Sequence, residues 1–370
     1  METSHHRWMA EALRQAKRGL FTTSPNPRVG CVIVQDEALI ASGWHEYTGG
    51  PHAEANALAA ADIPSGADFY VTLEPCSHHG RTPPCVDAVI AAKPARVIVA
   101  MQDPNPKIGG RGLAKLKDAG IQTLTGILEV PARELNRGFV KRMQRGMPFV
   151  SVKMATSLDG RSALANGDSH WITGEAARRD VQFQRARSDA ILSSAQTVLA
   201  DDPSLSVRLS SAELGQAREM RQPVRALVDS RLRLSGDEKI FDTEGDIWIY
   251  TLNDDTSAAQ RLGERGAKVI GIDVGDDGHV SLSAMLSDLG ARGINEVHTE
   301  CGAGLAGALL RQDLADQVLL YLAPHLLGSH ARGSFDLGEI GDMTQRKSVK
   351  IEDTRQIGDD LRFTLRLENA

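Results

Sequence analysis

Hydrophobic positions in the first third of the chain switch between helical and strand spacing. Residues 5–18 carry apolar side chains three or four positions apart, which predicts an amphipathic helix ending near Gly19. Apolar runs with strand character occupy residues 31–35, 39–44, 68–74 and 95–101, and helical patterns occupy residues 52–61 and 85–92. This order of helices and strands predicts an α/β layer packing with a mixed sheet.

A second α/β pattern follows a basic stretch, KRMQRGMP at residues 141–148, which is punctuated by glycine and proline. We place a domain boundary there, with one domain at residues 1–146 and another at residues 147–370. The predicted strands of the second domain are residues 149–154, 189–194, 224–230, 246–251, 267–272, 296–300 and 316–323. The polar stretch 210–222 is predicted to be a surface loop or a short helix.

Composition and charge exclude several classes of function. The 370-residue chain has a formal net charge of −6 and no run of basic residues, which argues against a nucleic-acid partner but allows a small anionic substrate. Its four cysteines do not suggest a disulfide framework in so long a chain. The N-terminal stretch lacks the apolar core of a signal peptide, and no stretch approaches the ~18 apolar residues of a membrane span. We therefore expect a cytoplasmic protein with no membrane partner.

Histidine, glutamate and cysteine residues form a pattern typical of a metal site. His52 and Glu54 lie at the start of a predicted helix; Cys76 follows a predicted strand, and Cys85 opens the next helix. One imidazole and two thiolates suit zinc better than iron, and three protein ligands leave the fourth tetrahedral position open, as in catalytic zinc sites. Glu54 would act as a proton shuttle rather than as a ligand. The alternative is a structural zinc knot, or buried thiols with His52 capping its helix.

The spacing of the two cysteines departs from a known signature. H-x-E followed by P-C-x-x-C marks zinc nucleobase deaminases, whereas this chain has H-A-E and then P-C-x8-C. The longer loop holds His78, His79 and Arg81, which either face a substrate or are solvated. Pro83 and Pro84 restrict the approach to the second cysteine.

Several longer stretches resemble one known family. They are FTTSPNPRVGCVIV (21–34), GGPHAEANAL (49–58), VTLEPCSHHGRTPPC (71–85), MQDPNPKIGGRGL (101–113), LNRGFVKRM (135–143), KMATSLDGRSALANGDSHWITG (153–174), ARSDAILSSAQTVLADDPSLSVR (186–208) and CGAGLAGALL (301–310). In order, and over nearly the whole chain, they are similar to the bifunctional deaminase–reductases of riboflavin biosynthesis. The resemblance implies a cytidine-deaminase-like mixed-sheet domain followed by a dihydrofolate-reductase-like α/β domain.

The resemblance also implies two reactions on a small phosphorylated pyrimidine. The first domain would use zinc to remove a ring amino group of diaminohydroxyphosphoribosylaminopyrimidine as ammonia. The second would use NADPH to reduce the ribosyl group of the resulting aminophosphoribosylaminouracil to ribityl. Paired reductase domains are expected from the family, and hence a homodimer or a higher homo-oligomer.

Family roles carry over to positions of the deaminase half. His52, Cys76 and Cys85 match the zinc ligands, and Glu54 matches the proton donor and acceptor. The positions that match the pyrimidine-phosphate pocket are Asn26, His45, His78, Arg81, Asp103 and Asn105. The eight-residue gap between the cysteines is characteristic of this family.

The reductase half offers a second set of positions. Lys153 lies near the carboxyl end of a predicted strand, where it would orient or polarise the ribosyl carbon, unless it is a surface lysine. We assign catalytic roles to Lys153 and Asp201. The resemblance assigns substrate contacts to Ser169, Arg185, Leu205, Arg208 and Glu300, and Arg185 with Arg208 would form a fork for the phosphate. It assigns cofactor contacts to Ala155, Trp171, Thr197, Asp201, Ser230, Gly302, Ala303, Gly304, Leu305, Ala306 and Gly307.

The stretch from residue 296 to residue 310 reads as a strand, a glycine-rich turn and a helix start, an arrangement that can cradle a diphosphate. Its sequence C-G-A-G-L-A-G lacks the spacing of a Rossmann fingerprint. Family members often carry E-G-G here, so Cys301 adds a side chain at the turn. Arg231 and Arg233 are candidates for binding the 2′-phosphate that distinguishes NADPH from NADH, or belong to a solvated strand face.

Two other functions share parts of this pattern. A deaminase acting on a base in tRNA or DNA would have the same zinc constellation, but the acidic balance and the second α/β domain count against it. A zinc-stabilised module that senses a nucleotide without turnover would not need Glu54 beside an open metal position.

Overall fold

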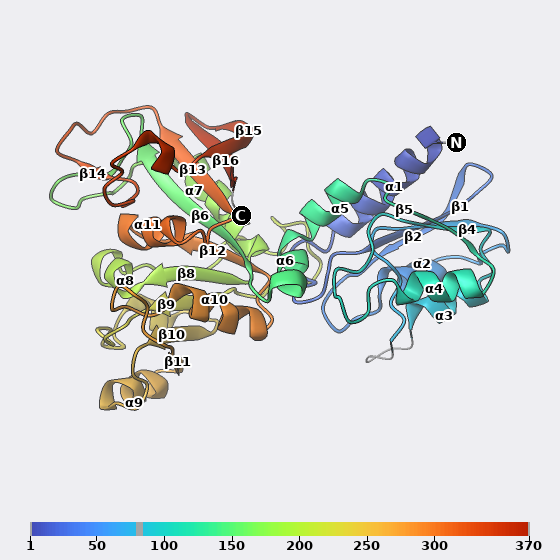
Figure 1. The fold of residues 1–370 in the computed structure, drawn as a ribbon, viewed down its shortest axis with the longest axis horizontal. Helices are drawn as coiled ribbons and strands as arrows, with labels where there is room; N and C mark the ends of the chain where they lie inside the picture. Colours follow the sequence, from blue (N-terminus) through green and yellow to red (C-terminus); the bar gives the residue numbers. More distant parts are fainter. Residues whose placement is uncertain (1, 79–83, 369–370) are drawn as a thin grey trace. The chain divides into compact units, whose positions relative to one another are not determined.

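The computed structural model describes residues 2–78 and 84–368 (Figure 1). The chain divides into two compact units, Met1–Gly146 and Met147–Ala370. Each unit is built on a main β-sheet with packed helices, so the predicted α/β class is confirmed. None of the described helices combines the length and the apolar character needed to cross a membrane.

The first unit contains a five-stranded mixed sheet in the order β2-β1-β3-β4-β5. Its strands are β1 (Gly30–Gln35), β2 (Ala38–Trp44), β3 (Asp68–Val71), β4 (Arg96–Val99) and β5 (Gln122–Thr125). β1 pairs antiparallel with β2 and β3, and β3, β4 and β5 run parallel. Residues 30–34 of β1 are all buried, as expected for an apolar strand covered on both faces.

Helices cover both faces of this sheet (Figure 1). They are α1 (Glu2–Lys17), α2 (Ala53–Ala59), α3 (Cys85–Ala91), α4 (Arg111–Asp118), α5 (Glu129–Leu135) and α6 (Arg137–Arg145). α1 contacts α5, whereas α3 contacts both α2 and α4. The predicted apolar face of α1 is confirmed: Trp8, Met9, Ala12, Leu13 and Ala16 are all buried in the core of the unit.

The second unit contains a nine-stranded sheet in the order β11-β10-β9-β8-β12-β6-β13-β16-β15. Its strands are β6 (Phe149–Ser157), β8 (Ala190–Ser194), β9 (Val224–Val228), β10 (Ile247–Thr251), β11 (Ala267–Gly271), β12 (Glu296–Glu300), β13 (Gln317–Ala323), β15 (Val349–Ile357) and β16 (Asp360–Leu367). From β11 to β13 every neighbouring pair is parallel, and β16 pairs antiparallel with β13 and β15. A separate two-stranded sheet joins β7 (Arg161–Ala163) to β14 (Arg332–Gly333).

Two apolar clusters cover the opposite faces of the large sheet. Ile191 and Leu192 are neighbours on β8 and belong to different clusters, as alternation along a strand requires. The unit's helices are α7 (Glu175–Arg187), α8 (Ala195–Asp201), α9 (Ser257–Glu264), α10 (Leu282–Ala291) and α11 (Ala303–Arg311), with short 3-10 turns η1 (Lys239–Asp242) and η2 (Met343–Gln345). One cluster includes residues of α10 and α11, and the other includes residues of α8 and α9.

The structure differs from the sequence-based expectation at several places. β6 continues to Ser157 instead of ending at residue 154, so Lys153 lies in the middle of the strand and not near its carboxyl end. The prediction did not include β5 or the long hairpin of β15 and β16, whose outer strand is almost wholly exposed. Helix α6 continues through the basic stretch to Arg145, where the prediction had a polar boundary segment. β3 ends at Val71, three residues earlier than predicted, so residues 72–74 have already left the strand.

Close packing of α11 generates a stability prediction for the second unit. A Cβ on Gly307 would lie 1.8 Å from the backbone oxygen of Asp336, whereas a Cβ on Gly304 in the same helix would meet nothing within 4 Å. We expect Gly307→Ala to destabilise the second unit by about 1–3 kcal/mol because the backbone must shift. Gly304→Ala should be neutral or stabilising by up to about 1 kcal/mol. Calorimetry of the second unit's unfolding transition checks this, and equal shifts for the two variants would contradict it.

Candidate active sites

Three predicted metal ligands meet in the first unit. His52 immediately precedes α2, and its side chain makes no capping hydrogen bond, so the imidazole is available as a ligand. Its Nδ1 lies 3.5 Å from Sγ of Cys76 and 3.2 Å from Sγ of Cys85, the first residue of α3. The three ligand atoms all lie within 4.8 Å of one another. This donor set fits a borderline-soft cation such as zinc and supplies three of four tetrahedral positions.

The start of α3 favours a thiolate at this point. The backbone N–H of Cys85 donates to Sγ of Cys76 over 3.3 Å. Hydrogen bonding from the Cys85 thiol, with further bonds from His52 and the Cys85 amide, lowers the pKa of Cys76. A helix N-terminus and neighbouring donors are the usual means by which a protein keeps a cysteine deprotonated.

Glu54 lies in the first turn of α2, two residues after His52. Its side chain is 3% exposed, and burial raises the pKa of its carboxyl to about 7. The carboxyl also interacts with the Cys85 thiol, which places it beside the three donors. The arrangement gives the metal cluster one buried carboxyl that can hold or release a proton.

His45 lies next to His52, and Asn26 contacts His45. Nδ1 of His45 is 2.9 Å from the Pro51 carbonyl, which can only accept, so Nδ1 carries the proton. Nε2 then accepts from Nδ2 of Asn26 over 3.2 Å. Burial lowers the pKa of His45, which favours the neutral ring, and the rings of His45 and His52 form a T-shaped pair with their centroids 5.4 Å apart. His45 therefore borders the metal cluster, and Asn26 is joined to the cluster through His45.

The other predicted pocket residues follow Cys76 or β4. His78 is exposed, and Asp103 and Asn105 are half-buried in the segment between β4 and α4. Oδ1 of Asp103 accepts the backbone N–H of Asn105 over 2.8 Å, and burial raises the pKa of Asp103. Arg81 lies outside the described residues, as do His79 and Pro83.

A buried ion pair occupies the centre of the predicted reductase site. Glu300 ends β12 and stands opposite Lys153 of β6 in the parallel register. Arg185 of α7 donates to both carboxylate oxygens of Glu300, over 2.5 and 2.8 Å, and its third nitrogen donates to the Ser206 carbonyl over 2.8 Å. Although burial opposes ionisation of Glu300, Arg185 holds the pKa of that carboxyl well below its ordinary value. Nε2 of His298, two residues earlier on β12, lies 3.6 Å from the same carboxylate.

This ion pair corrects one expectation. The predicted phosphate fork of Arg185 and Arg208 is not formed, because the Arg185 guanidinium is buried and directed at Glu300 whereas Arg208 is exposed. The backbone around residues 205–208 is nevertheless held to α7, since the Arg208 N–H donates to Oε1 of Gln182 over 2.9 Å. Leu205, another predicted substrate position, is buried.

The predicted cofactor positions converge partly at the start of α11. The N–H of Gly302, its N-cap, donates to Oγ1 of Thr197 over 3.3 Å, which joins α8 to α11. α11 has no side-chain cap, and a Cβ on Gly302 or Gly304 would meet nothing within 4 Å. Gly302 and Gly304 are exposed, so the uncapped start of the helix is accessible, which fits the diphosphate of a nicotinamide cofactor.

The remaining predicted cofactor and substrate positions of the second unit lie on several different elements. Ala155 shares a face of β6 with Lys153, and Ser230 after β9 accepts the N–H of Val280 over 3.1 Å. Trp171 is 69% exposed, with the guanidinium of Arg178 positioned 4.6 Å from its ring centroid. Ser169 and Asp201 have no hydrogen bond or ion pair to the Lys153–Glu300 group within the described part of the chain.

Sequence reasoning missed Glu74, His298 and Arg178, which contact the predicted site residues or their backbone. A signal existed for Glu74, because a carboxylate at the end of an apolar strand is buried only when its charge is compensated. His298 gave no such signal, since it occupies an ordinary position in the alternating strand EVHTE.

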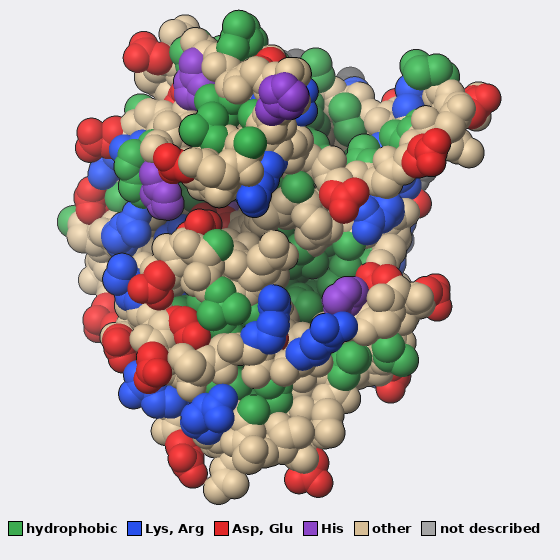
Figure 2. Space-filling model, turned by 90° about the vertical axis from the view of Figure 1, so that its left-hand side faces the viewer, with side chains coloured by type: hydrophobic (Ala, Val, Ile, Leu, Met, Phe, Trp, Pro, Cys, Tyr) green, Lys and Arg blue, Asp and Glu red, His purple; other side chains and the backbone are tan. Residues whose placement is uncertain are grey.

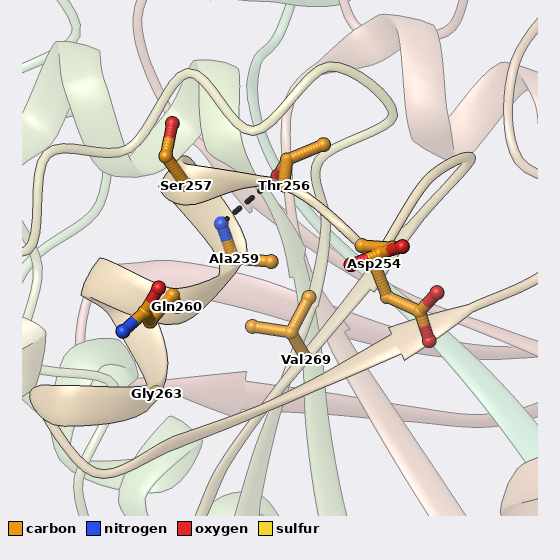
Figure 3. A pocket seen from close by; sticks show the side chains of 8 residues that line it. Asp254, Thr256, Ser257, Ala259, Gln260, Gly263 and Val269 are labelled. Atoms are coloured by element: carbon orange, nitrogen blue, oxygen red, sulfur yellow. Dashed lines mark hydrogen bonds between the residues drawn. The ribbon is translucent and has the colours of Figure 1, made fainter.

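An open hollow beside α9 is separate from these positions (Figure 3). It is lined by Asp254, Asp255, Thr256, Ser257, Ala259, Gln260, Gly263 and Val269. None of the predicted site residues within the described ranges lines it. Its two aspartates would repel a phosphorylated ligand.

Comparison with known proteins covers both units. Residues 148–363 match the family described as RibD C-terminal domain, and residues 2–101 match the cytidine and deoxycytidylate deaminase zinc-binding region. Riboflavin biosynthesis protein RibD of Escherichia coli K12 is 46% identical over 360 residues, which cover 96% of this chain and 97% of that protein. The Haemophilus influenzae protein of the same name is 43% identical over 364 residues, with 96% of each chain covered.

Solved structures agree with these matches. Acinetobacter baumannii RibD, form 1, superposes with a TM-score of 0.92 at 41% identity over 99% of both chains. A diaminohydroxyphosphoribosylaminopyrimidine deaminase/5-amino-6-(5-phosphoribosylamino)uracil reductase from Thermotoga maritima gives a TM-score of 0.86 at 32% identity, again over 99% of both chains. The two domains imply zinc and a nicotinamide cofactor. The chain thus belongs to the RibD family, the bifunctional deaminase–reductases of riboflavin biosynthesis.

Proposed function

We propose that the chain catalyses both reactions for which its Thermotoga maritima relative is named: deamination of diaminohydroxyphosphoribosylaminopyrimidine, then reduction of 5-amino-6-(5-phosphoribosylamino)uracil. The observation that carries the proposal is the meeting of one imidazole and two cysteine sulfurs beside a buried glutamate. A structural zinc site would complete its coordination with a fourth protein ligand, whereas the described residues supply three.

In the deaminase unit we assign the metal to His52, Cys76 and Cys85. Zinc, when bound, supplies a Lewis acid that makes water nucleophilic near neutral pH. Glu54 takes a proton from the attacking water and delivers it to the departing ring nitrogen, which leaves as ammonia. Its position on the first turn of α2 keeps it beside the ligands without making it one.

Pocket residues next to the metal orient the pyrimidine. Because the Asn26 amide donates to His45, its carbonyl oxygen is the group left to accept an N–H of the ring. Asp103 and Asn105 offer further polar groups from the segment between β4 and α4. His78 and Arg81 belong to the segment between the two cysteines, to which we assign the phosphoribosyl part of the substrate.

In the reductase unit we assign the cofactor's diphosphate to the start of α11, and the bound nicotinamide supplies the hydride. Lys153 donates a hydrogen bond to the ribosyl oxygen, where negative charge develops as the hydride arrives. Burial lowers the pKa of Lys153, and the nearby Glu300 carboxylate opposes this change and favours the charged form. Arg185 keeps the Glu300 carboxylate ionised and in place, and in this way acts indirectly on Lys153. Arg208 is exposed, and we assign the substrate phosphate to it. Catalytic Asp201 and substrate contact Ser169 remain assignments from the family resemblance.

Three finer features are part of this proposal. We assign the preference for NADPH to Arg231 and Arg233, which are exposed next to Ser230, because a 2′-phosphate is the group that such arginines bind. We place the protein in the cytoplasm, and the four free cysteines agree with a reducing compartment. We expect a homodimer or a higher homo-oligomer from the family resemblance.

Surface charge favours a small substrate over a nucleic acid. On the face drawn in Figure 2, acidic side chains are interspersed among the basic ones instead of leaving a continuous basic patch. The net charge of the chain is −6. A polynucleotide partner would require a basic face that neutralises successive phosphates.

Replacement of Glu54 tests the deaminase assignment. We expect Glu54→Ala to lower ammonia release by at least about a hundredfold, because the proton shuttle is lost. Zinc content and reduction of pre-deaminated substrate should stay unchanged. Glu129→Ala, on α5, is the matched control, since its side chain is exposed in an ion pair with Arg133. Equal loss of both activities in Glu54→Ala would contradict two independent sites.

A double-mutant cycle tests the Arg185–Glu300 pair. Removing one partner leaves the other buried without its counter-charge, so Arg185→Met and Glu300→Gln should each destabilise the second unit by about 3–5 kcal/mol. The double variant should lose much less than the sum of the two. The exposed pair of Arg265 and Asp242 in the same unit is the control, with an expected coupling below about 1 kcal/mol. Equal coupling in both pairs, measured by calorimetry, would show that Arg185 does not act through Glu300.

A further inference from the structure

Glu74 carries a carboxylate that is almost fully buried and surrounded by backbone donors. Its side chain is 4% exposed. One oxygen accepts the N–H groups of Asp103 and Gly110, over 3.1 and 2.8 Å. The other accepts those of Gly112 and Leu113, over 2.7 and 3.2 Å. Four peptide dipoles, rather than a cationic side chain, thus compensate the negative charge.

The four donors belong to the start of α4 and the segment before it. α4 begins at Arg111, and its N-cap, Gly110, provides no side-chain acceptor. The first N–H groups of a helix need acceptors from outside the helix, and its positive end favours a carboxylate. Glu74 meets both needs from a position 36 to 39 residues earlier in the chain.

The same carboxylate fixes both ends of the segment between β4 and α4. At the beginning it holds the N–H of Asp103, and the Glu74 N–H itself donates to the Met101 carbonyl over 3.0 Å. At the end it holds residues 110–113. Between these points lie the carboxylate of Asp103 and its partner Asn105, joined over 2.8 Å.

The position of Glu74 in the chain links this segment to the metal cluster. Glu74 precedes Cys76 by two residues and follows the end of β3, so the backbone that holds its carboxylate also carries a metal ligand. Fixing the segment to Glu74 therefore fixes Asp103 and Asn105 relative to the point where His52 and the two cysteines meet.

We propose that Glu74 is a positioning residue for the deamination, which holds Asp103 and Asn105 against the pyrimidine without touching either substrate or metal. The proposal rests on the function assigned above to the first unit. A carboxylate is needed because a glutamine of the same shape would turn an N–H₂ donor toward two backbone N–H donors. Leaving those donors without an acceptor costs about 1–3 kcal/mol each.

Glu74→Gln in the full chain tests the proposal. We expect the KM for deamination to rise about tenfold or more, the equivalent of about 1.4 kcal/mol, with a smaller change in kcat. Zinc stoichiometry and reduction of pre-deaminated substrate should match the parent protein. Glu129→Gln in the same unit is the control, because that side chain is exposed in an ion pair on α5.

The mechanism of action is tested by combining variants. If Glu74 acts through Asp103 and Asn105, then Glu74→Gln should add little to the KM already raised by Asp103→Ala with Asn105→Ala. A merely structural role would instead give additive effects. An unchanged KM in Glu74→Gln, or loss of zinc accompanying the change in KM, overturns the proposal.

A milder variant covers the case in which Glu74→Gln does not fold. Glu74→Asp keeps the charge but is too short by one methylene to reach all four donors, so it should raise KM by a smaller factor. A parent-like KM in Glu74→Asp would then overturn the proposal. Absence of ammonia release by the zinc-loaded parent protein would count against the proposed function itself rather than against the role of Glu74.

Discussion

The first unit is organised by the requirement that one imidazole and two cysteine sulfurs meet at a single point. His52 arrives from the start of α2, Cys85 from the start of α3, and Cys76 from the segment that leaves β3. Each donor lies where a helix begins or a strand has just ended, so the sheet and the two helices must pack in one register for all three to converge. The helix starts add N–H groups and positive dipole ends, which favour deprotonated sulfur. The described residues supply three donors, and the buried carboxyl of Glu54 interacts with one of them, the Cys85 thiol.

In the second unit, side chains from separate elements also converge at one point, where they form a buried charge pair instead of a set of metal donors. Glu300 ends β12 and stands beside Lys153, which lies in the middle of the neighbouring parallel strand β6. Arg185 compensates the carboxylate from α7, which lets Glu300 stay ionised despite its burial. The uncapped start of α11 follows directly after β12, which ends at Glu300. In both units several of the chemical groups therefore lie at strand ends and helix starts, whereas Lys153 lies within β6.

Sequence reasoning anticipated the features that depend on local pattern and missed those that depend on long-range compensation. The parallel strands of the second unit were predictable because they are short apolar runs between polar segments. The β15–β16 hairpin was not, since its outer strand is rich in exposed polar residues and shows no buried apolar face. The metal donors could be named from their residue types and from their places at predicted strand ends and helix starts, although the spacing of the cysteines departs from the known signature. The pairing of Arg185 with Glu300 spans 115 positions, so the sequence instead suggested an arginine open to a phosphate. For Glu74 the sequence carried a signal that the charge is compensated, but not the partners that compensate it, because these are backbone groups in a distant segment.

X-ray absorption at the zinc edge of the zinc-loaded full chain tests the central claim most directly. We expect one zinc per chain with two sulfur ligands at about 2.3 Å and two nitrogen or oxygen ligands at about 2.0–2.1 Å. One of the light ligands should be the imidazole of His52, and the other should come from solvent. Cys85→Ser should reduce the sulfur count from two to one. Four protein ligands, a third sulfur, or a spectrum unaffected by Cys85→Ser would contradict an open catalytic zinc site built from His52, Cys76 and Cys85.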